Sequence, residues 1–203
     1  MSIQTVHSFD EFASAVLTTI GSVDAKYTVG LSGGSTIPPV IKSLCADQSY
    51  TSLSQNIVWT WIDERLVAYD ADGSNFGAMK ESLGSNSNCL PIPFEDGQAQ
   101  ATNYQEAISG DKLPALDLLI LGFGDDGHIA SLFPGSDALE KKCSDTDWLF
   151  RSQASYAPVE RWSWAMDALA KAKKTIVVYK GSADCENAKK LDAATNDPPC
   201  DTP

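Results

Sequence analysis

The sequence predicts an α/β domain with a mainly parallel β-sheet. Short apolar runs alternate with segments of helical periodicity about five times along the chain. One run, Leu116–Gly122, is apolar at almost every position, as is typical of a central strand buried on both faces. The chain has 203 residues and shows neither an internal repeat nor a linker. We therefore expect a single domain over residues 1–203 with one sizeable core.

Each expected element has a local sequence signal. Ser8–Glu11 has the pattern of a capping box, and the apolar residues after it recur on one helical face to about Ile20. Prolines and polar residues predict a surface connection over 85–98 and an irregular tail over 195–203. In chain order we expect helix 8–20, strand 27–31, helix 38–45, strand 57–62, loop 70–76, helix 76–84, one or two helical turns in 103–108, strand 116–122, strand 148–153, a mostly helical segment 161–173, strand 175–179 and helix 182–194.

Charge and cysteine content exclude several classes of protein. The net charge is -12, with 15 Lys and Arg against 27 Asp and Glu, so we expect neither nucleic acid nor a membrane surface as a partner. No apolar run is long enough to span a bilayer, and the first residues lack the features of a secretory signal. The 5 cysteines are scattered and form no C-x-x-C pair, which argues against a disulfide scaffold or a metal site and favours the cytoplasm.

Three polar loops follow predicted strands, at 32–36, 63–65 and 122–128. The carboxyl ends of parallel strands meet at one edge of a sheet, so we expect these loops to converge there. Ligands bind at this edge in open α/β sheets. The sequence therefore predicts one binding site formed by all three loops.

The first loop has the composition of a phosphate cradle. Adjacent glycines between hydroxyl residues allow a tight turn whose amides point one way, ahead of a helix N-terminus. A plain strand-to-helix turn has the same pattern. Gly30–Gly34 also matches the G-x-S-x-G elbow of serine hydrolases, although few strands precede it. The candidate residues in this loop are Ser32, Gly33, Gly34, Ser35 and Thr36.

The loop at 122–128 is the richest in chemistry. Asp126 lies two residues before His128, near enough to orient its ring, and Gly127 between them frees the backbone. Histidine changes its charge near neutral pH and serves as a general base. A structural histidine is the plain alternative, and a calcium loop is disfavoured because the 12-residue ligand spacing is absent.

Two arginines are candidates for holding an anion. Arg65 ends the charged triplet Asp63-Glu64-Arg65; such a cluster is usually solvated, but at the rim of the sheet its guanidinium could hold a phosphate. Arg161 precedes the aromatic run Trp162–Trp164. It is either a surface arginine stacked on tryptophan or a second cation of the site.

Together these segments resemble the 6-phosphogluconolactonases. The resemblance runs from about residue 7 to 194 and includes LSGGST (31–36), WIDERLV (61–67), SNFG (74–77), the block 116–135 and the Arg161 segment before VVYKG. It implies a Rossmann-like three-layer sandwich, similar to glucosamine-6-phosphate deaminase and ribose-5-phosphate isomerase. It also implies hydrolysis of 6-phosphoglucono-δ-lactone to 6-phosphogluconate in the oxidative pentose phosphate pathway. We expect a cytoplasmic monomer that needs no metal or organic cofactor.

The resemblance also implies roles for individual residues. His128 would activate a water molecule, and Asp126 would orient its ring. The phosphate would lie against the glycine loop, with charge supplied by Arg65 and Arg161. Asp63, Asn75 and Gly127 complete the expected substrate site.

Two other functions remain as alternatives to lactone hydrolysis. A sugar-phosphate deaminase or isomerase is the first, but that group usually carries F-N-E-P and D-E-Y where this chain has SLFP at 131–134 and DER at 63–65. A non-catalytic sugar-phosphate binder is the second. It is favoured by Asp184, which stands where the lactonases usually have a lysine and predicts weaker phosphate binding unless Lys180 compensates.

Overall fold

The central sheet of the fold is parallel and has five strands. A computed structural model describes residues 8–84, 87–94, 98–109 and 114–179. The strand order is β4-β2-β1-β5-β8, and each neighbouring pair is parallel. These strands are β1 (Tyr27–Leu31), β2 (Ile57–Trp61), β4 (Asn88–Leu90), β5 (Leu118–Gly122) and β8 (Thr175–Val178). The expected α/β fold with a mainly parallel sheet is confirmed.

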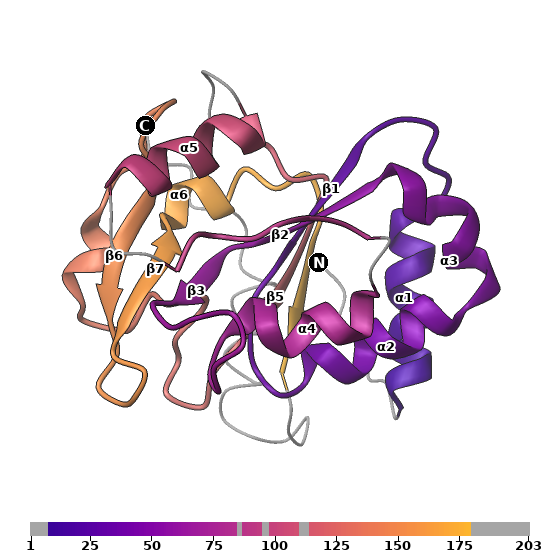
Figure 1. Cartoon of the computed structure of the whole chain (residues 1–203), viewed down its shortest axis with the longest axis horizontal. Helices are drawn as coiled ribbons and strands as arrows, with labels where there is room; N and C mark the ends of the chain where they lie inside the picture. The colour runs from indigo at the N-terminus through magenta and orange to yellow at the C-terminus, as the bar shows by residue number, and fades with distance from the viewer. Residues whose placement is uncertain (1–7, 85–86, 95–97, 110–113, 180–203) are drawn as a thin grey trace, which may run out of the picture.

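Helices cover both faces of this sheet (Figure 1). The helices are α1 (Phe9–Ile20), α2 (Ile37–Ala46), α3 (Gln48–Leu53), α4 (Asn75–Leu83), α5 (Gln98–Ser109) and the short α6 (Met166–Leu169). Alternate side chains of β2 define the two faces. Trp61 packs edge-on against Phe76 of α4, with ring centres 4.9 Å apart. Its neighbour Thr60 points the other way and shares a 2.7 Å hydrogen bond with Tyr104 of α5. The arrangement is therefore a three-layer sandwich.

A second, antiparallel sheet continues from the end of β2. Its order is β3-β7-β6, with β3 (Asp63–Arg65), β6 (Leu149–Gln153) and β7 (Glu160–Trp164). Ile62 joins β2 to β3, and its carbonyl accepts a 2.8 Å hydrogen bond from the Trp164 amide. Arg65 lies directly opposite Arg161 in this sheet. The two candidate arginines are therefore neighbours.

The expectation that residues 161–173 are mostly helical is wrong. The segment begins within β7, and α6 has only four residues. Trp162 and Trp164 fall on one face of β7, and Arg161 and Ser163 on the other. This period of two is a strand signal. The Ala- and Lys-rich residues that follow have high helix propensity and masked it.

The expectation of a surface connection over 85–98 is also wrong for residues 88–90 and for its last residue. Residues Asn88–Leu90 form β4, which extends the sheet next to β2. Helix α5 begins at Gln98 and continues to Ser109, well beyond the one or two turns predicted for 103–108. The helix has few apolar positions, so its periodicity is weak.

The capping signal at the first helix is confirmed. The Ser8 side chain accepts a 3.1 Å hydrogen bond from the Glu11 amide, and α1 ends at Ile20. The helix expected at 182–194, the tail 195–203 and the positions of Asp184 and Lys180 lie outside the described residues.

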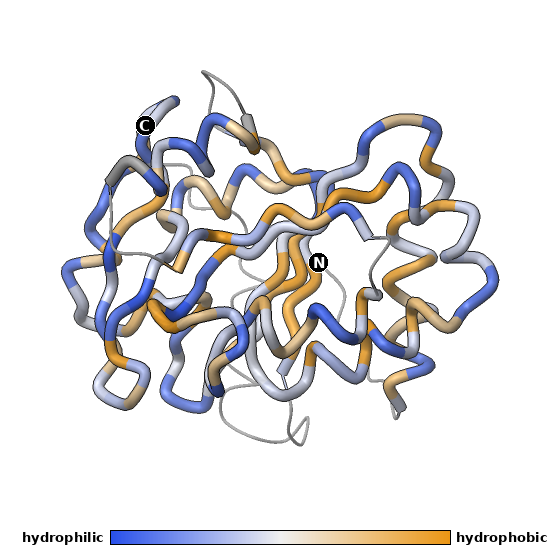
Figure 2. Tube along the Cα trace, in the orientation of Figure 1, coloured by the Kyte–Doolittle hydropathy of each residue, from blue (hydrophilic) through white to orange (hydrophobic). Residues whose placement is uncertain are grey.

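Residues of high hydropathy concentrate in the strands of the central sheet (Figure 2). Val29, Leu31 and Ile120 are completely buried. The same core includes Trp164 of β7 and Trp148, which directly precedes β6, and the centres of their rings lie 4.3 Å apart. Within the described part of the chain, no helix combines the length and apolar character needed to cross a membrane.

Candidate active site

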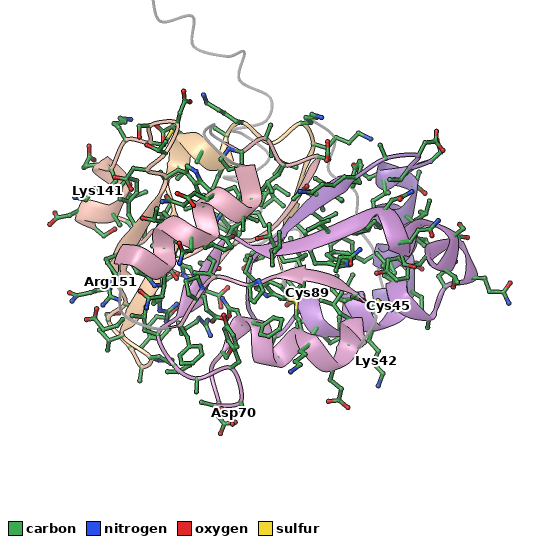
Figure 3. All side chains as sticks on the ribbon, turned by 45° about the horizontal axis from the view of Figure 1, so that its top comes forward. Lys42, Cys45, Asp70, Cys89, Lys141 and Arg151 are labelled. Atoms are coloured by element: carbon green, nitrogen blue, oxygen red, sulfur yellow. The ribbon has the colours of Figure 1, made fainter. Side chains whose placement is uncertain are left out.

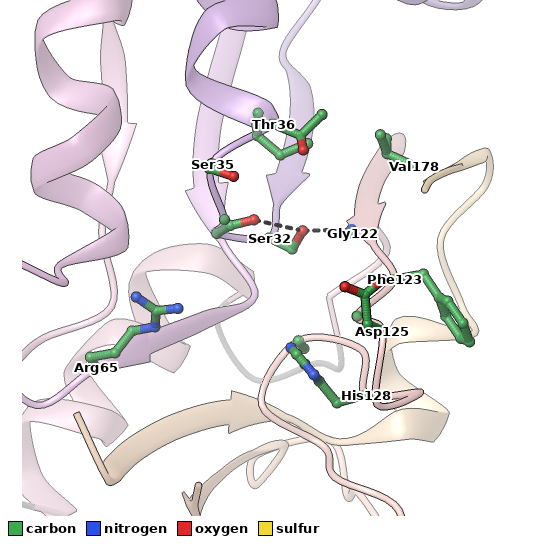
Figure 4. Close-up of a pocket in the computed structure, with 14 residues that line it drawn as sticks. Ser32, Ser35, Thr36, Arg65, Gly122, Phe123, Asp125, His128 and Val178 are labelled. Carbon is green, nitrogen blue, oxygen red and sulfur yellow. Dashed lines mark hydrogen bonds between the residues drawn. The ribbon is translucent and has the colours of Figure 1, made fainter. Parts of the chain in front are cut away.

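A pocket of about 270 Å³ opens where β1, β5 and β8 end (Figure 4). The expected residues that line it are Ser32, Gly33, Gly34, Ser35, Thr36, Arg65 and His128. The other lining residues are Ile37, Gly122, Phe123, Gly124, Asp125, Ala130 and Val178. All three polar segments therefore contribute to one cavity, although residues 63–65 form strand β3 rather than the expected loop.

The glycine loop forms the wall of the pocket between β1 and α2. Gly34 has a φ of 101°, a conformation that glycine adopts without strain. Pro38 and Pro39 occupy the first turn of α2 and have no amide hydrogen. Amide donors at this helix start must therefore come from the loop itself and from Ile37. These donors, the positive end of the helix and the hydroxyls suit an anion.

Ser32 connects the glycine loop to the histidine loop. Its Oγ accepts a 2.6 Å hydrogen bond from the Gly122 amide, and the residue is only 3% exposed. His128 contacts Asp126 through its Nδ1 atom. Among the described residues, the hydrogen bonds of these two side chains do not join Ser32 to His128. The pattern of a serine nucleophile next to its base is thus not the arrangement found.

The histidine loop holds His128 and Asp126 as a pair. The Nδ1 atom of His128 contacts Oδ1 of Asp126, which leaves Nε2 for a ligand. The loop closes through a 2.9 Å hydrogen bond from the Gly124 amide to the His128 carbonyl. A Cβ on Gly124 would lie 2.4 Å from the His128 ring, so only glycine fits beneath the pair. Gly127 adopts a φ of 85° and does not itself line the pocket.

The His128 contact also keeps Asp126 ionised. Burial acts to raise the pKa of Asp126, but hydrogen bonds from the His128 ring and amide outweigh it and lower the pKa. The carboxylate thus remains an acceptor for the Nδ1 proton. This geometry orients the imidazole for proton transfer at Nε2.

Arg65 provides a cation in the pocket. Its Nη1 donates a 2.6 Å hydrogen bond to the Gly73 carbonyl. The alternative that the charged triplet is solvated does not hold for its first two members, because Asp63 is 2% exposed and Glu64 is fully buried. Strand β3 places them inside the protein and leaves Arg65 at the cavity.

Asn75 and Asp63 lie behind the pocket wall. The Asn75 side chain donates a 2.9 Å hydrogen bond to the Asp63 carbonyl. It also fills the space in front of Gly33, where a Cβ would lie 1.9 Å from Asn75 Oδ1. The Asp63 carboxylate accepts a 2.7 Å hydrogen bond from Ser131. Neither expected residue lines the cavity itself.

Arg161 is buried rather than stacked on tryptophan. It is 1% exposed, and its guanidinium lies 5.5 Å from the Phe133 ring centre and 5.0 Å from that of Tyr156. Burial and the nearby Arg65 charge lower its pKa, and Asp63 partly offsets them. Arg161 does not line the pocket.

The surface arginine stacked on tryptophan is Arg151. Its guanidinium lies 5.2 Å from the Trp162 ring and 2.6 Å from Glu160. Arg151 is on β6, in the second sheet (Figure 3). Of the three arginines, Arg65 alone lines the pocket.

Sequence reasoning missed several lining residues. Asp125 directs its carboxylate into the cavity and hydrogen-bonds the Tyr179 hydroxyl at 3.4 Å. Phe123 packs against the same tyrosine. Both belong to the loop 122–128, so their place in a loop already singled out was the available signal. Val178, at the end of β8, carried no chemical signal. Among the described residues, no group of three or more His, Cys, Asp or Glu could hold a metal ion.

Sequence comparison identifies the family. A model of the glucosamine-6-phosphate isomerases/6-phosphogluconolactonase family matches residues 4–203. The chain belongs to this family. Probable 6-phosphogluconolactonase 1 of Arabidopsis thaliana is 31% identical over 204 aligned positions, which cover 90% of this chain and 73% of the plant protein. Human 6-phosphogluconolactonase is 30% identical over 182 positions, covering 82% and 69% of the two chains.

Solved 6-phosphogluconolactonase structures share the fold. The Thermotoga maritima structure has a TM-score of 0.76 and 26% identity, covering 94% of this chain and 87% of its own. The Shewanella baltica structure has a TM-score of 0.74 and 26% identity, covering 92% and 80%. The expected resemblance to the 6-phosphogluconolactonases is confirmed.

Proposed function

We propose that this protein hydrolyses 6-phosphoglucono-δ-lactone to 6-phosphogluconate. The observation that carries the proposal is that His128, which is paired with Asp126, lines the same pocket as the glycine loop and Arg65. The pocket thus combines a candidate base with a candidate anion site. The named lactonases among the relatives support this substrate.

The phosphate is proposed to bind at the glycine loop. Amides of Gly34, Ser35 and Thr36 and the hydroxyls beside them are the donors, and Arg65 supplies a charge-assisted contact. Arg161 adds positive potential from behind Arg65, since the two charges interact. This assignment places the lactone ring towards His128.

The proposed chemistry is general-base hydrolysis. Nε2 of His128 takes a proton from water, and the oxygen attacks the lactone carbonyl carbon. The resulting oxyanion collapses, the bond from that carbon to the ring oxygen breaks, and the imidazolium returns its proton to the leaving oxygen. Asp126 stabilises the imidazolium and fixes its ring. The products are a free hydroxyl and a carboxylic acid, which releases its proton to the solvent at neutral pH, so the reaction as written needs no metal or cofactor.

Asp63, Asn75 and Gly127 are proposed to support this site from behind its surface. The Asn75 side chain packs against Gly33 of the glycine loop, and the Asp63 carboxylate accepts a hydrogen bond from the Ser131 hydroxyl. We also propose that the enzyme acts as a monomer in the cytoplasm. Consistent with a reducing compartment, Cys45, Cys89 and Cys143 are free thiols.

Product analysis tests the proposal. The lactone would be generated enzymatically from glucose 6-phosphate, and its loss followed with and without the protein, because the spontaneous reaction sets the blank. We expect faster appearance of 6-phosphogluconate. Ammonia released from glucosamine 6-phosphate would instead favour the deaminase alternative. Binding of 6-phosphogluconate without any acceleration would favour a non-catalytic binder.

A further inference from the structure

Glu64 is a buried carboxylate that the proposed chemistry does not use. Its side chain accepts hydrogen bonds from four donors. Oε1 accepts from the Arg65 and Asn75 amides, both at 2.7 Å. Oε2 accepts from the Phe76 amide at 2.8 Å and from the Ser74 hydroxyl at 3.2 Å.

These bonds tie β3 to the start of α4. The Asn75 and Phe76 amides belong to the first turn of α4, where the helix itself offers no acceptors. Glu64 reaches these two amides from 11 and 12 positions earlier in the chain, and its negative charge suits this helix end. The Ser74 hydroxyl accepts a 2.9 Å hydrogen bond from the Gly77 amide and donates one to Glu64. Ser74 and Glu64 together therefore bind the free amides at the start of the helix.

Two of the residues that Glu64 holds shape the anion end of the pocket. Arg65 lines the cavity, and its backbone amide is bonded directly to Glu64. Asn75 packs against Gly33 of the glycine loop. One carboxylate therefore sets the relative position of the cation and the loop.

We propose that Glu64 is a positioning residue for the phosphate end of the substrate, acting through the backbones of Arg65 and Asn75. Glu64 is fully buried and does not line the pocket, so it touches no ligand. The inference rests on the proposed function, which places a phosphate at that end. It predicts that loss of this carboxylate weakens anion binding more than the chemical step.

The test compares Glu64→Gln and Glu64→Asp with Gln105→Ala. Gln105 is a matched control, because it is also buried and its Oε1 accepts the Trp148 and Leu149 amides at 2.9 and 3.0 Å. It lies in α5 and does not line the pocket. For each protein we would measure KM and kcat for the lactone, the Kd for 6-phosphogluconate by calorimetry, and the melting temperature.

We expect Glu64→Gln to raise KM and Kd about tenfold or more while kcat changes less than about threefold, because the amide replaces one acceptor oxygen with a donor. Glu64→Asp keeps the charge and should have a smaller effect in the same direction, and it covers the case in which Glu64→Gln fails to fold. Gln105→Ala should lower the melting temperature and leave KM and Kd unchanged.

Two results would overturn the inference. One is a normal KM and Kd in both folded Glu64 variants, and the other is an equal rise in Gln105→Ala. The Kd arm separates this outcome from failure of the proposed function. If the wild-type protein binds 6-phosphogluconate without hydrolysing the lactone, the proposed function is refuted. The role of Glu64 is still tested in that case, because the Kd values of the Glu64 variants can be compared with that of the wild type. A wild-type protein that binds no 6-phosphogluconate overturns both.

Discussion

The Oγ of Ser32 accepts a 2.6 Å hydrogen bond from the amide of Gly122, a residue 90 positions later in the chain. Ser32 begins the glycine loop after β1, and Gly122 ends β5 ahead of the histidine loop. The bond therefore joins the candidate anion site to the candidate base. The spacing between the two halves of the site depends on this contact.

Replacing Ser32 with Ala should loosen that connection. The variant leaves the Gly122 amide without its acceptor, which should lower the free energy of unfolding by about 1–3 kcal/mol. Lactone hydrolysis should decline but persist, since Ser32 is not the nucleophile. Urea unfolding and steady-state kinetics check both effects. Complete loss of activity in a stable variant would instead support the serine-nucleophile alternative.

The side chain of Asn75 occupies the space that a side chain at position 33 would need. A Cβ there would lie 1.9 Å from Asn75 Oδ1, and Asn75 is anchored on the Asp63 carbonyl. We expect Gly33→Ala to cost about 1–3 kcal/mol of stability through overpacking and to raise KM. Adding Asn75→Ala should recover part of the stability, which a double-mutant cycle measures. Additive losses in the cycle would show that the two side chains do not collide.

Arg65 is expected to contribute mainly to substrate binding. Arg65→Met removes a charge-assisted contact worth about 1.5–3 kcal/mol, so kcat/KM should drop by roughly 10- to 100-fold, mostly through KM. Arg151→Met is the matched control, because Arg151 pairs with Glu160 and lies outside the pocket lining. Steady-state kinetics of both variants test the assignment, and equal losses would refute it.

Replacing Asp126 should reduce the catalytic rate and change how the stability of the protein depends on pH. Asp126→Asn should reduce kcat by about 100-fold or more with little change in KM. The native pKa lies below the ordinary 3.8, so the stabilising contribution of the carboxylate is present above that value and is lost as pH falls through the native pKa. The stability gap between wild type and variant should thus shrink as the pH falls below about 4. Urea unfolding at each pH measures the gap, and a gap that widens in acid would contradict the assignment.

Much of the site was predictable because it depends on local pattern and topology. Apolar runs located four of the five parallel strands, all except β4, and the carboxyl ends of such strands share one edge. The loop that begins at Ser32 and the loop that ends at His128 could therefore be placed side by side from the sequence alone. The adjacency of Asp126 to His128 needed only their separation of two positions.

The second sheet and the buried charges depend on contacts that local sequence does not show. Arg161 alternates with tryptophans in a strand, but the helix-forming residues after it dominated the prediction. Glu64 appears solvated in its charged triplet, and only the start of α4, brought back against β3, explains its burial. Such partners are set by tertiary packing.

The central claim is that His128 is the base for lactone hydrolysis, and the most direct test is the enzyme-dependent rate of lactone loss in wild type and His128→Ala at equal concentration. The spontaneous rate is subtracted, and equal melting temperatures establish that both proteins are folded. We expect acceleration by wild type and a loss of about 100- to 10,000-fold in the variant. Undiminished acceleration by the folded variant would contradict it.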